Sequence, residues 1–175
     1  IGDYNDAVLA ELTPMDNLAI TAAFARRQAA AAVDESGNFA EIGDIGDGVY
    51  ILDAKYEVLK GLVINPYYYE AKDIASYYGL KTTFDTDTFG LTGHYAASNE
   101  DDSSMKNASI YNLEARTAIE DVQLALGYIK TNEDISSIAT AGDNIDPTEE
   151  IGAYETDAKT VYASVGYTIA NIDLS

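Results

Sequence analysis

Apolar and polar residues alternate through residues 50–73, on both sides of a short turn at Leu59-Lys60-Gly61. Successive side chains of a strand point to opposite faces, so the pattern predicts a hairpin with two chemically different faces. One face collects Tyr50, Leu52, Ala54, Tyr56, Val58, Leu62, Ile64, Pro66 and Tyr68. The other face collects Asp53, Lys55, Glu57, Asn65, Tyr67 and Tyr69. The function depends on what lies against each face.

The same alternation recurs in five pairs of segments, which we predict to be antiparallel hairpins. The predicted strands are Ala7–Leu12, Leu18–Arg27, Val49–Val58, Leu62–Ala71, Ala75–Phe84, Phe89–Ala97, Ser109–Ile119, Val122–Thr131, Lys159–Ile169 and Ile172–Ser175. Turns within the pairs are short and rich in hairpin-forming residues, whereas three of the four connections between pairs are long. Short turns at one end and long loops at the other are typical of bacterial outer-membrane barrels. The full strands, of about 9–11 residues, also have the length that a tilted strand needs to cross a bilayer.

Alternation alone does not separate a membrane barrel from a soluble barrel or sandwich, which would turn the same apolar face inward. The placement of aromatic residues favours the membrane barrel. Near the long-loop ends of the apolar face are Tyr50, Tyr68, Tyr78, Tyr95, Tyr111 and Tyr128. Near the short-turn ends are Tyr56, Phe84, Phe89 and Tyr167. Two aromatic rows on either side of an aliphatic band match the girdles of a membrane barrel.

Composition and charge exclude several other classes. The 175 residues include 30 Asp and Glu against 10 Lys and Arg, a formal net charge of −20 that would repel nucleic acid. Apolar residues make up 47% and there are 14 tyrosines, too much apolar surface for a disordered chain. The absence of cysteine excludes disulfides and thiolate metal sites. No apolar run approaches the ~18 residues of a membrane helix.

Charged residues on the polar face are the candidate functional side chains, because charges along a water-filled pore decide which solutes pass. The candidate pore-lining residues are Arg27, Asp53, Lys55, Glu57, Lys81, His94, Glu114 and Arg116. Charges of both signs would produce a field across the pore that favours polar or charged solutes. For each one taken singly, the alternative is an ion pair on a solvated wall, which contributes little.

Two long loops, residues 28–48 and 131–158, carry thirteen acidic residues and no lysine or arginine. Acidic groups near a pore mouth concentrate cations within a Debye length of about 8–10 Å and so favour cation passage. Asp143, Asp146, Glu149 and Glu150 could bind Ca²⁺ or Mg²⁺, or bridge to lipopolysaccharide phosphates through such ions. Their spacing lacks the alternating ligands and central glycine of an EF-hand loop, so solubilising charge is the alternative. No other cofactor is expected.

Catalytic groups are sparse. The only histidine, His94, lies between Gly93 and Tyr95 and has no aspartate two residues away. Without a base in reach, no serine or aspartate can be argued to act as a nucleophile. We therefore expect that the protein is not an enzyme and that His94 is a polar residue of the pore.

Three segments carry a family resemblance: "TPMDNLAITAAFARR", "YILDAKYEVLKGLVINPYYY" and "YNLEARTAIEDVQLALGYIKTNED". They resemble the repeating hairpins of OprD-like porins and, in texture, the major outer-membrane porins of campylobacter-type bacteria. The resemblance implies an all-β, antiparallel up-and-down transmembrane β-barrel of sixteen to eighteen strands, often trimeric. About ten strands are present here and no aromatic residue ends the chain, so residues 1–175 are expected to be a single barrel segment, incomplete at both ends.

Together these features predict a porin of the bacterial outer membrane, which lets ions and small hydrophilic solutes diffuse passively and favours cations. Its expected surroundings are outer-membrane lipid and lipopolysaccharide, and the resemblance implies a homotrimer. Two alternatives remain open from the sequence. One is a soluble β-barrel that binds an apolar ligand, and the other is a surface structural or adhesin barrel without channel activity.

Overall fold

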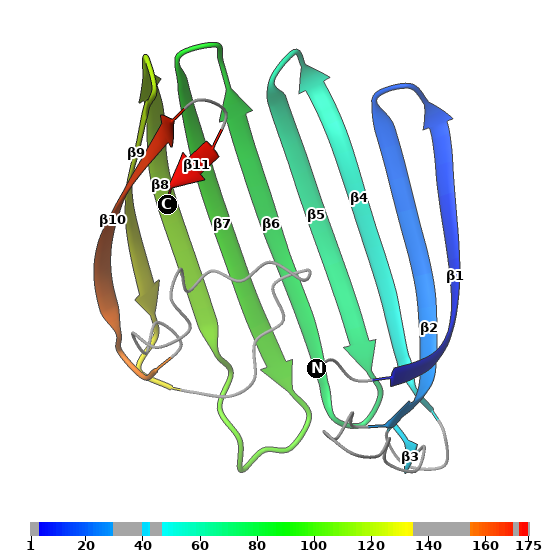
Figure 1. Ribbon diagram of the computed structural model, residues 1–175. Helices are drawn as coiled ribbons and strands as arrows, with labels where there is room; N and C mark the ends of the chain where they lie inside the picture. The colour runs from blue at the N-terminus through cyan, green and yellow to red at the C-terminus, as the bar shows by residue number, and fades with distance from the viewer. Residues whose placement is uncertain (1–3, 30–39, 43–46, 135–154, 170–171, 175) are drawn as a thin grey trace.

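The structure is a computed structural model that describes residues 4–29, 40–42, 47–134, 155–169 and 172–174. All of its regular elements are strands (Figure 1). They are β1 (Tyr4–Met15), β2 (Leu18–Ala29), β3 (Ala40–Glu41), β4 (Val49–Leu59), β5 (Leu62–Ala71), β6 (Ala75–Asp85), β7 (Phe89–Glu100), β8 (Ser109–Ile119), β9 (Val122–Thr131), β10 (Lys159–Ile169) and β11 (Ile172–Leu174). No helix in this part of the chain is long and apolar enough to cross a membrane.

The strands form a single antiparallel sheet in which each long strand pairs with its neighbours in the chain. The two-residue β3 lies beside the end of β2. The all-β, up-and-down order predicted from the alternation is therefore confirmed. Most strand bounds agree within two residues, but β1 begins three residues earlier and ends three residues later than predicted, β7 ends three residues later, and β3 was not predicted.

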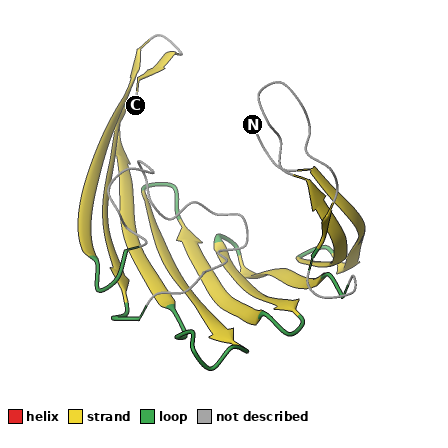
Figure 2. Cartoon of the chain, turned by 90° about the horizontal axis from the view of Figure 1, so that it is seen from below, coloured by secondary structure: helices red, strands yellow, loops and turns green. Residues whose placement is uncertain are grey.

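The sheet is strongly curved. Viewed along the strands, it forms an open arc with β1 near one edge and β10 and β11 near the other (Figure 2). Short turns lie at the top of Figure 1, and the connections from β5 to β6 and from β7 to β8 lie at the bottom. The turn between β4 and β5 needs Gly61, whose φ is +83° and where a Cβ would overlap the carbonyl oxygen of Asp85.

The convex face of the sheet is apolar and exposed. Leu113 and Leu126 leave 58% and 59% of their surface uncovered although they lie in the middle of long strands. Around them, aromatic side chains meet across strands, with Tyr68 paired to Tyr78 near the longer connections. Near the short turns, the rings of Phe84 and Phe89 lie 5.9 Å apart in an edge-to-face arrangement.

The concave face carries the polar side chains, and several of them are buried. Asn65 and His94 retain only 5% and 4% of their surface, and Asn112 is also buried. No buried side-chain nitrogen or oxygen among the described residues lacks a hydrogen-bond partner. The faces thus have the opposite arrangement from a water-soluble sheet, which buries apolar residues and exposes polar ones. This concave surface of β4 to β10, called the concave wall below, is the candidate functional site.

Candidate functional site

Cross-strand pairing places polar side chains from four strands in one row of the concave wall. Asn65 on β5 pairs with Lys81 on β6, Lys81 pairs with His94 on β7, and His94 pairs with Asn112 on β8. Because side chains alternate along a strand, the next concave row lies two residues nearer the short turns. That row holds Thr83, Thr92 and Glu114.

A hollow of about 400 Å³ lies at the β4 end of these rows. Asp53, Lys55 and Lys81 line it, so it carries charges of both signs. The side-chain amide of Asn65 donates to Asp53 Oδ2 at 2.7 Å and to the carbonyl oxygen of Ala54 at 2.9 Å, which fixes the carboxylate against the wall. Thr21, Ile51, Val63, Asn65, Tyr69 and Thr83 complete the lining.

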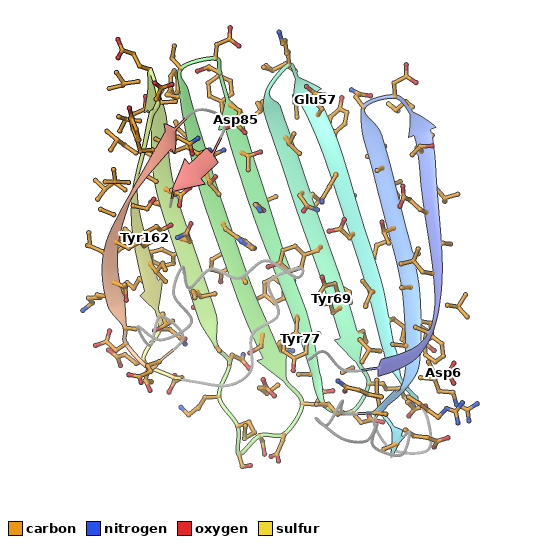
Figure 3. The ribbon with its side chains drawn as sticks, in the orientation of Figure 1. Asp6, Glu57, Tyr69, Tyr77, Asp85 and Tyr162 are labelled. Carbon is orange, nitrogen blue, oxygen red and sulfur yellow. The ribbon has the colours of Figure 1, made fainter. Side chains whose placement is uncertain are left out.

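Toward the longer connections the wall becomes aromatic and aliphatic (Figure 3). Tyr67 packs with Ala96, Ile110 and Ile129 in a buried cluster, and Tyr69 and Tyr162 pack against it. The hydroxyl of Tyr67 lies 2.9 Å from Nε2 of His94, and their rings meet edge to face. The face that the alternation predicted to be polar therefore also carries an apolar and aromatic cluster.

A second polar group joins β8 to β10. The hydroxyl of Tyr162 donates to Glu114 Oε2 at 2.8 Å and accepts from the side-chain amide of Asn112 at 3.1 Å. These contacts connect residues that are about fifty positions apart in the sequence and hold the Glu114 carboxylate against the wall.

Arg116 lies beside this group, nearer the short turns. Its NH1 donates to Thr92 Oγ1 at 2.7 Å and lies 3.5 Å from Glu114 Oε1, while its NH2 pairs with Asp85 at the end of β6. One guanidinium therefore neutralises two carboxylates on different strands. The side chain of Arg116 is about one-third exposed, so this pairing contributes little to stability and chiefly sets the local charge.

Two of the candidate pore-lining residues lie away from this group. Glu57 lies at the short-turn end of β4, where its Oε1 accepts a hydrogen bond of 3.1 Å from the backbone N–H of Gly61. Arg27 lies at the other end of the sheet, where its Nε donates to Asp6 Oδ2 at 2.9 Å. A register shift between Asp6 and Ala7 interrupts the alternation there, so the parity that assigned Arg27 to the polar face does not carry through.

The structure thus gathers Asp53, Lys55, Lys81, His94, Glu114 and Arg116 on the concave wall. That they line a pore stays a prediction. Asp85 and Tyr162 were not among the predicted site residues. Asp85 was assigned to a turn, and only the register of β8, β9 and β10 reveals that Tyr162 shares a row with Glu114.

The candidate divalent-cation ligands Asp143, Asp146, Glu149 and Glu150 lie outside the described residues. Within the described part, no group of three or more histidine, aspartate or glutamate side chains could hold a metal ion. In the loop between β7 and β8, both the amide and the hydroxyl of Ser104 donate to Asp102 Oδ1, and they lower the pKa of that carboxyl. The divalent-cation site predicted at residues 143–150 stays a prediction.

The sequence matches no protein-family model, and no curated protein matches it significantly. Its structure is similar to the crystal structures of Pseudomonas aeruginosa OpdO (TM-score 0.73, 18% identity) and OccK7, also named OpdD (0.76, 17%). It is also similar to Acinetobacter baumannii OccAB3 (0.68, 14%).

These matches cover 94%, 97% and 93% of this chain and 48%, 48% and 45% of the respective structures. The chain therefore spans about half the length of the structures that it matches. At these identities the similarity shows the fold alone: the chain has the antiparallel β-barrel fold of these structures, as the resemblance of the sequence segments implied.

Proposed function

We propose that this chain forms part of the wall of a channel in the bacterial outer membrane, through which ions and small hydrophilic solutes diffuse passively. The observation that carries the proposal is the distribution of side chains between the two faces. Large apolar residues such as Leu113 and Leu126 are exposed on the convex face, and hydrogen-bonded polar residues such as Asn65 and His94 lie on the concave face. A barrel with lipid outside and water inside has this arrangement.

The same observation weakens the alternative of a soluble barrel with an apolar ligand. Such a barrel would line its interior with apolar side chains and present polar ones to water. Here the hollow at β4 is lined by Asp53, Lys55 and Lys81, and the convex face presents leucine and tyrosine. A surface barrel without channel activity would share the apolar exterior, and therefore only a measurement of conduction separates it from the proposal.

A preference for cations is the finer part of the proposal. The chain carries a net charge of −20, so cations are concentrated near its surface. On the concave wall itself, Lys55, Lys81 and Arg116 stand beside Asp53, Asp85 and Glu114, which leaves the wall close to neutral. The acidic connections, rather than the wall, would then supply the selectivity.

The proposal also includes outer-membrane lipid and lipopolysaccharide as partners, with divalent cations between lipopolysaccharide phosphates and the acidic connections. A homotrimer follows from the family resemblance. No catalytic role is proposed: the chain's one histidine is buried, and its Nε2 already lies at hydrogen-bond distance from the hydroxyl of Tyr67.

The test is the single-channel conductance of the natural full-length protein in a planar bilayer, with different salt concentrations on the two sides. We expect stepwise ohmic currents with a reversal potential on the cation side. Stable insertion without current would favour the barrel without channel activity. A protein that stays monomeric in water without detergent and gives no current would contradict the membrane location as well.

A further inference from the structure

Two tyrosine rings lie flat against the concave wall, each over a glycine of the neighbouring strand. Tyr67 on β5 pairs with Gly79 on β6, and Tyr162 on β10 pairs with Gly127 on β9. A Cβ added to Gly79 would stand 2.6 Å from Cε1 of Tyr67, and one added to Gly127 would overlap the ring of Tyr162. Each ring therefore occupies the space that a side chain of the next strand would fill.

Each ring also reaches past its glycine to a polar group on the strand beyond. The hydroxyl of Tyr67 meets His94 on β7, and the hydroxyl of Tyr162 meets Glu114 on β8. The arrangement of tyrosine, glycine and hydrogen-bond partner over three successive strands thus occurs twice, at separate places in the sheet. Figure 3 shows Tyr162 lying along the wall.

We propose that Gly79 and Gly127 set the width of the channel, because they allow two tyrosine rings to lie against the wall instead of standing in the lumen. This inference rests on the channel function proposed above. A methyl group at either position would displace the ring toward the concave side, since hydrogen-bonded backbone lies beneath it and cannot yield. At Gly127 the displaced ring would also leave the Glu114 carboxylate without its hydroxyl donor.

Glycines in strands can also serve the backbone, by allowing curvature or a bulge. The two roles differ in one respect. If Gly127 serves the backbone, Gly127→Ala has the same effect on the channel whether or not the Tyr162 ring is present. If Gly127 makes room for the ring, the effect of the substitution disappears once the ring is gone.

The test compares Gly127→Ala, Tyr162→Ala and the double variant in the natural full-length protein, by single-channel conductance and by the largest polyethylene glycol that enters the pore. We expect Gly127→Ala to lower both quantities and the double variant to recover the values of Tyr162→Ala. Gly93→Ala is the matched control, because Gly93 lies on the convex face and a Cβ there meets nothing nearer than Cδ2 of Leu113 at 3.7 Å. That variant should conduct like the wild type.

The inference is wrong if Gly127→Ala conducts like the wild type, or if the double variant remains as narrow as Gly127→Ala. If Gly127→Ala fails to fold, the double variant decides alone: conduction at the level of Tyr162→Ala supports the inference, and failure to fold assigns the glycine to the backbone. A wild-type protein that inserts without current removes the channel function itself, which distinguishes the failure of that proposal from the failure of this one.

Discussion

Leu113 and Glu114 are neighbours on β8, yet they belong to surfaces of opposite chemistry. Leu113 points to the convex side and leaves 58% of its surface exposed, with aliphatic and aromatic residues around it. Glu114 points to the concave side and accepts a hydrogen bond from Tyr162. In a water-soluble sheet the apolar partner of such a pair would be the buried one. The exposed fraction of a side chain therefore does not by itself identify whether water or lipid lies against it.

Exposure of the convex face to water would be energetically unfavourable. Each Å² of apolar surface left in water costs about 25 cal/mol relative to an apolar surrounding. Exposure of the concave wall to lipid would be unfavourable for the opposite reason, since hydrocarbon offers no hydrogen-bond or ionic partner to its charged groups. The sheet is therefore suited to separate two solvents, one apolar and one aqueous.

The largest effect is expected from a charge on the convex face. Leu113→Lys should lower the free energy of unfolding by about 2–4 kcal/mol, because it places an ammonium group in hydrocarbon near the middle of the sheet. Thr83→Lys is the matched control, because it places the same charge on the concave face. Thr82 lies in the cross-strand row of Gly93 and Leu113, so its neighbour Thr83 points to the opposite side. Urea unfolding in lipid vesicles measures both. Equal losses at the two positions would contradict the assignment of the faces.

A smaller effect is expected from the buried hydroxyl of the concave wall. Tyr67→Phe should lower the stability by about 0.5–1.5 kcal/mol, because it removes the hydrogen bond to buried His94. Tyr78→Phe, which alters an exposed ring on the convex face of the neighbouring strand, should change it less. The same urea experiment compares the two variants. A larger loss at Tyr78 would show that the convex hydroxyls, and not the concave ones, are buried.

Arg116→Met is expected to change selectivity more than stability. Without the guanidinium, Asp85 and Glu114 lose their shared positive partner, so the reversal potential in a salt gradient should move further to the cation side. Arg27→Met should produce a smaller shift, because Arg27 lies at the far end of the sheet in an exposed pair with Asp6. If the two shifts are equal, the position of a charge on the concave wall does not matter.

The smallest effect is expected at Asp102, which lies on neither face. Hydrogen bonds from the Ser104 amide and hydroxyl hold the pKa of Asp102 below its ordinary value of 3.8. A depressed pKa means that the stabilisation is present above the unfolded-state pKa and is lost as the pH falls through the folded-state value. Hydrogen exchange at Ser104 should therefore be slower in the wild type than in Asp102→Ala at neutral pH. A difference that persists in strong acid would rule out the ionised carboxylate as its cause.

The sequence allows the strands and their faces to be predicted because both depend on local information. Alternation with period two fixes which side chains share a face, and short turns such as Lys60-Gly61 fix where hairpins reverse. The strand β3 escaped prediction because two residues are too few to show a period. The extra residue of β2 near Arg27 was not predicted, because a bulge cannot be recognised from the alternation of apolar and polar residues.

The site was less predictable because its contacts depend on register across strands. Alternation places Asn112, Glu114 and Arg116 on one face, but it does not bring Tyr162 or Asp85 to them. The role of the glycines beneath the tyrosine rings could not be predicted from the sequence either, since Gly79 and Gly127 each look only like a residue that weakens its strand. Their partners become visible only when β5 is aligned with β6 and β9 with β10.

The most direct test of the two-faced sheet uses the absence of cysteine from the chain. Single cysteines introduced along β9 at positions 122–126 would be treated, in lipid vesicles, with a charged thiol reagent that does not dissolve in hydrocarbon. The account predicts that Gln123→Cys and Ala125→Cys react, whereas Val122→Cys, Leu124→Cys and Leu126→Cys are protected by lipid. Uniform reaction, or protection of positions 123 and 125 instead, would contradict it.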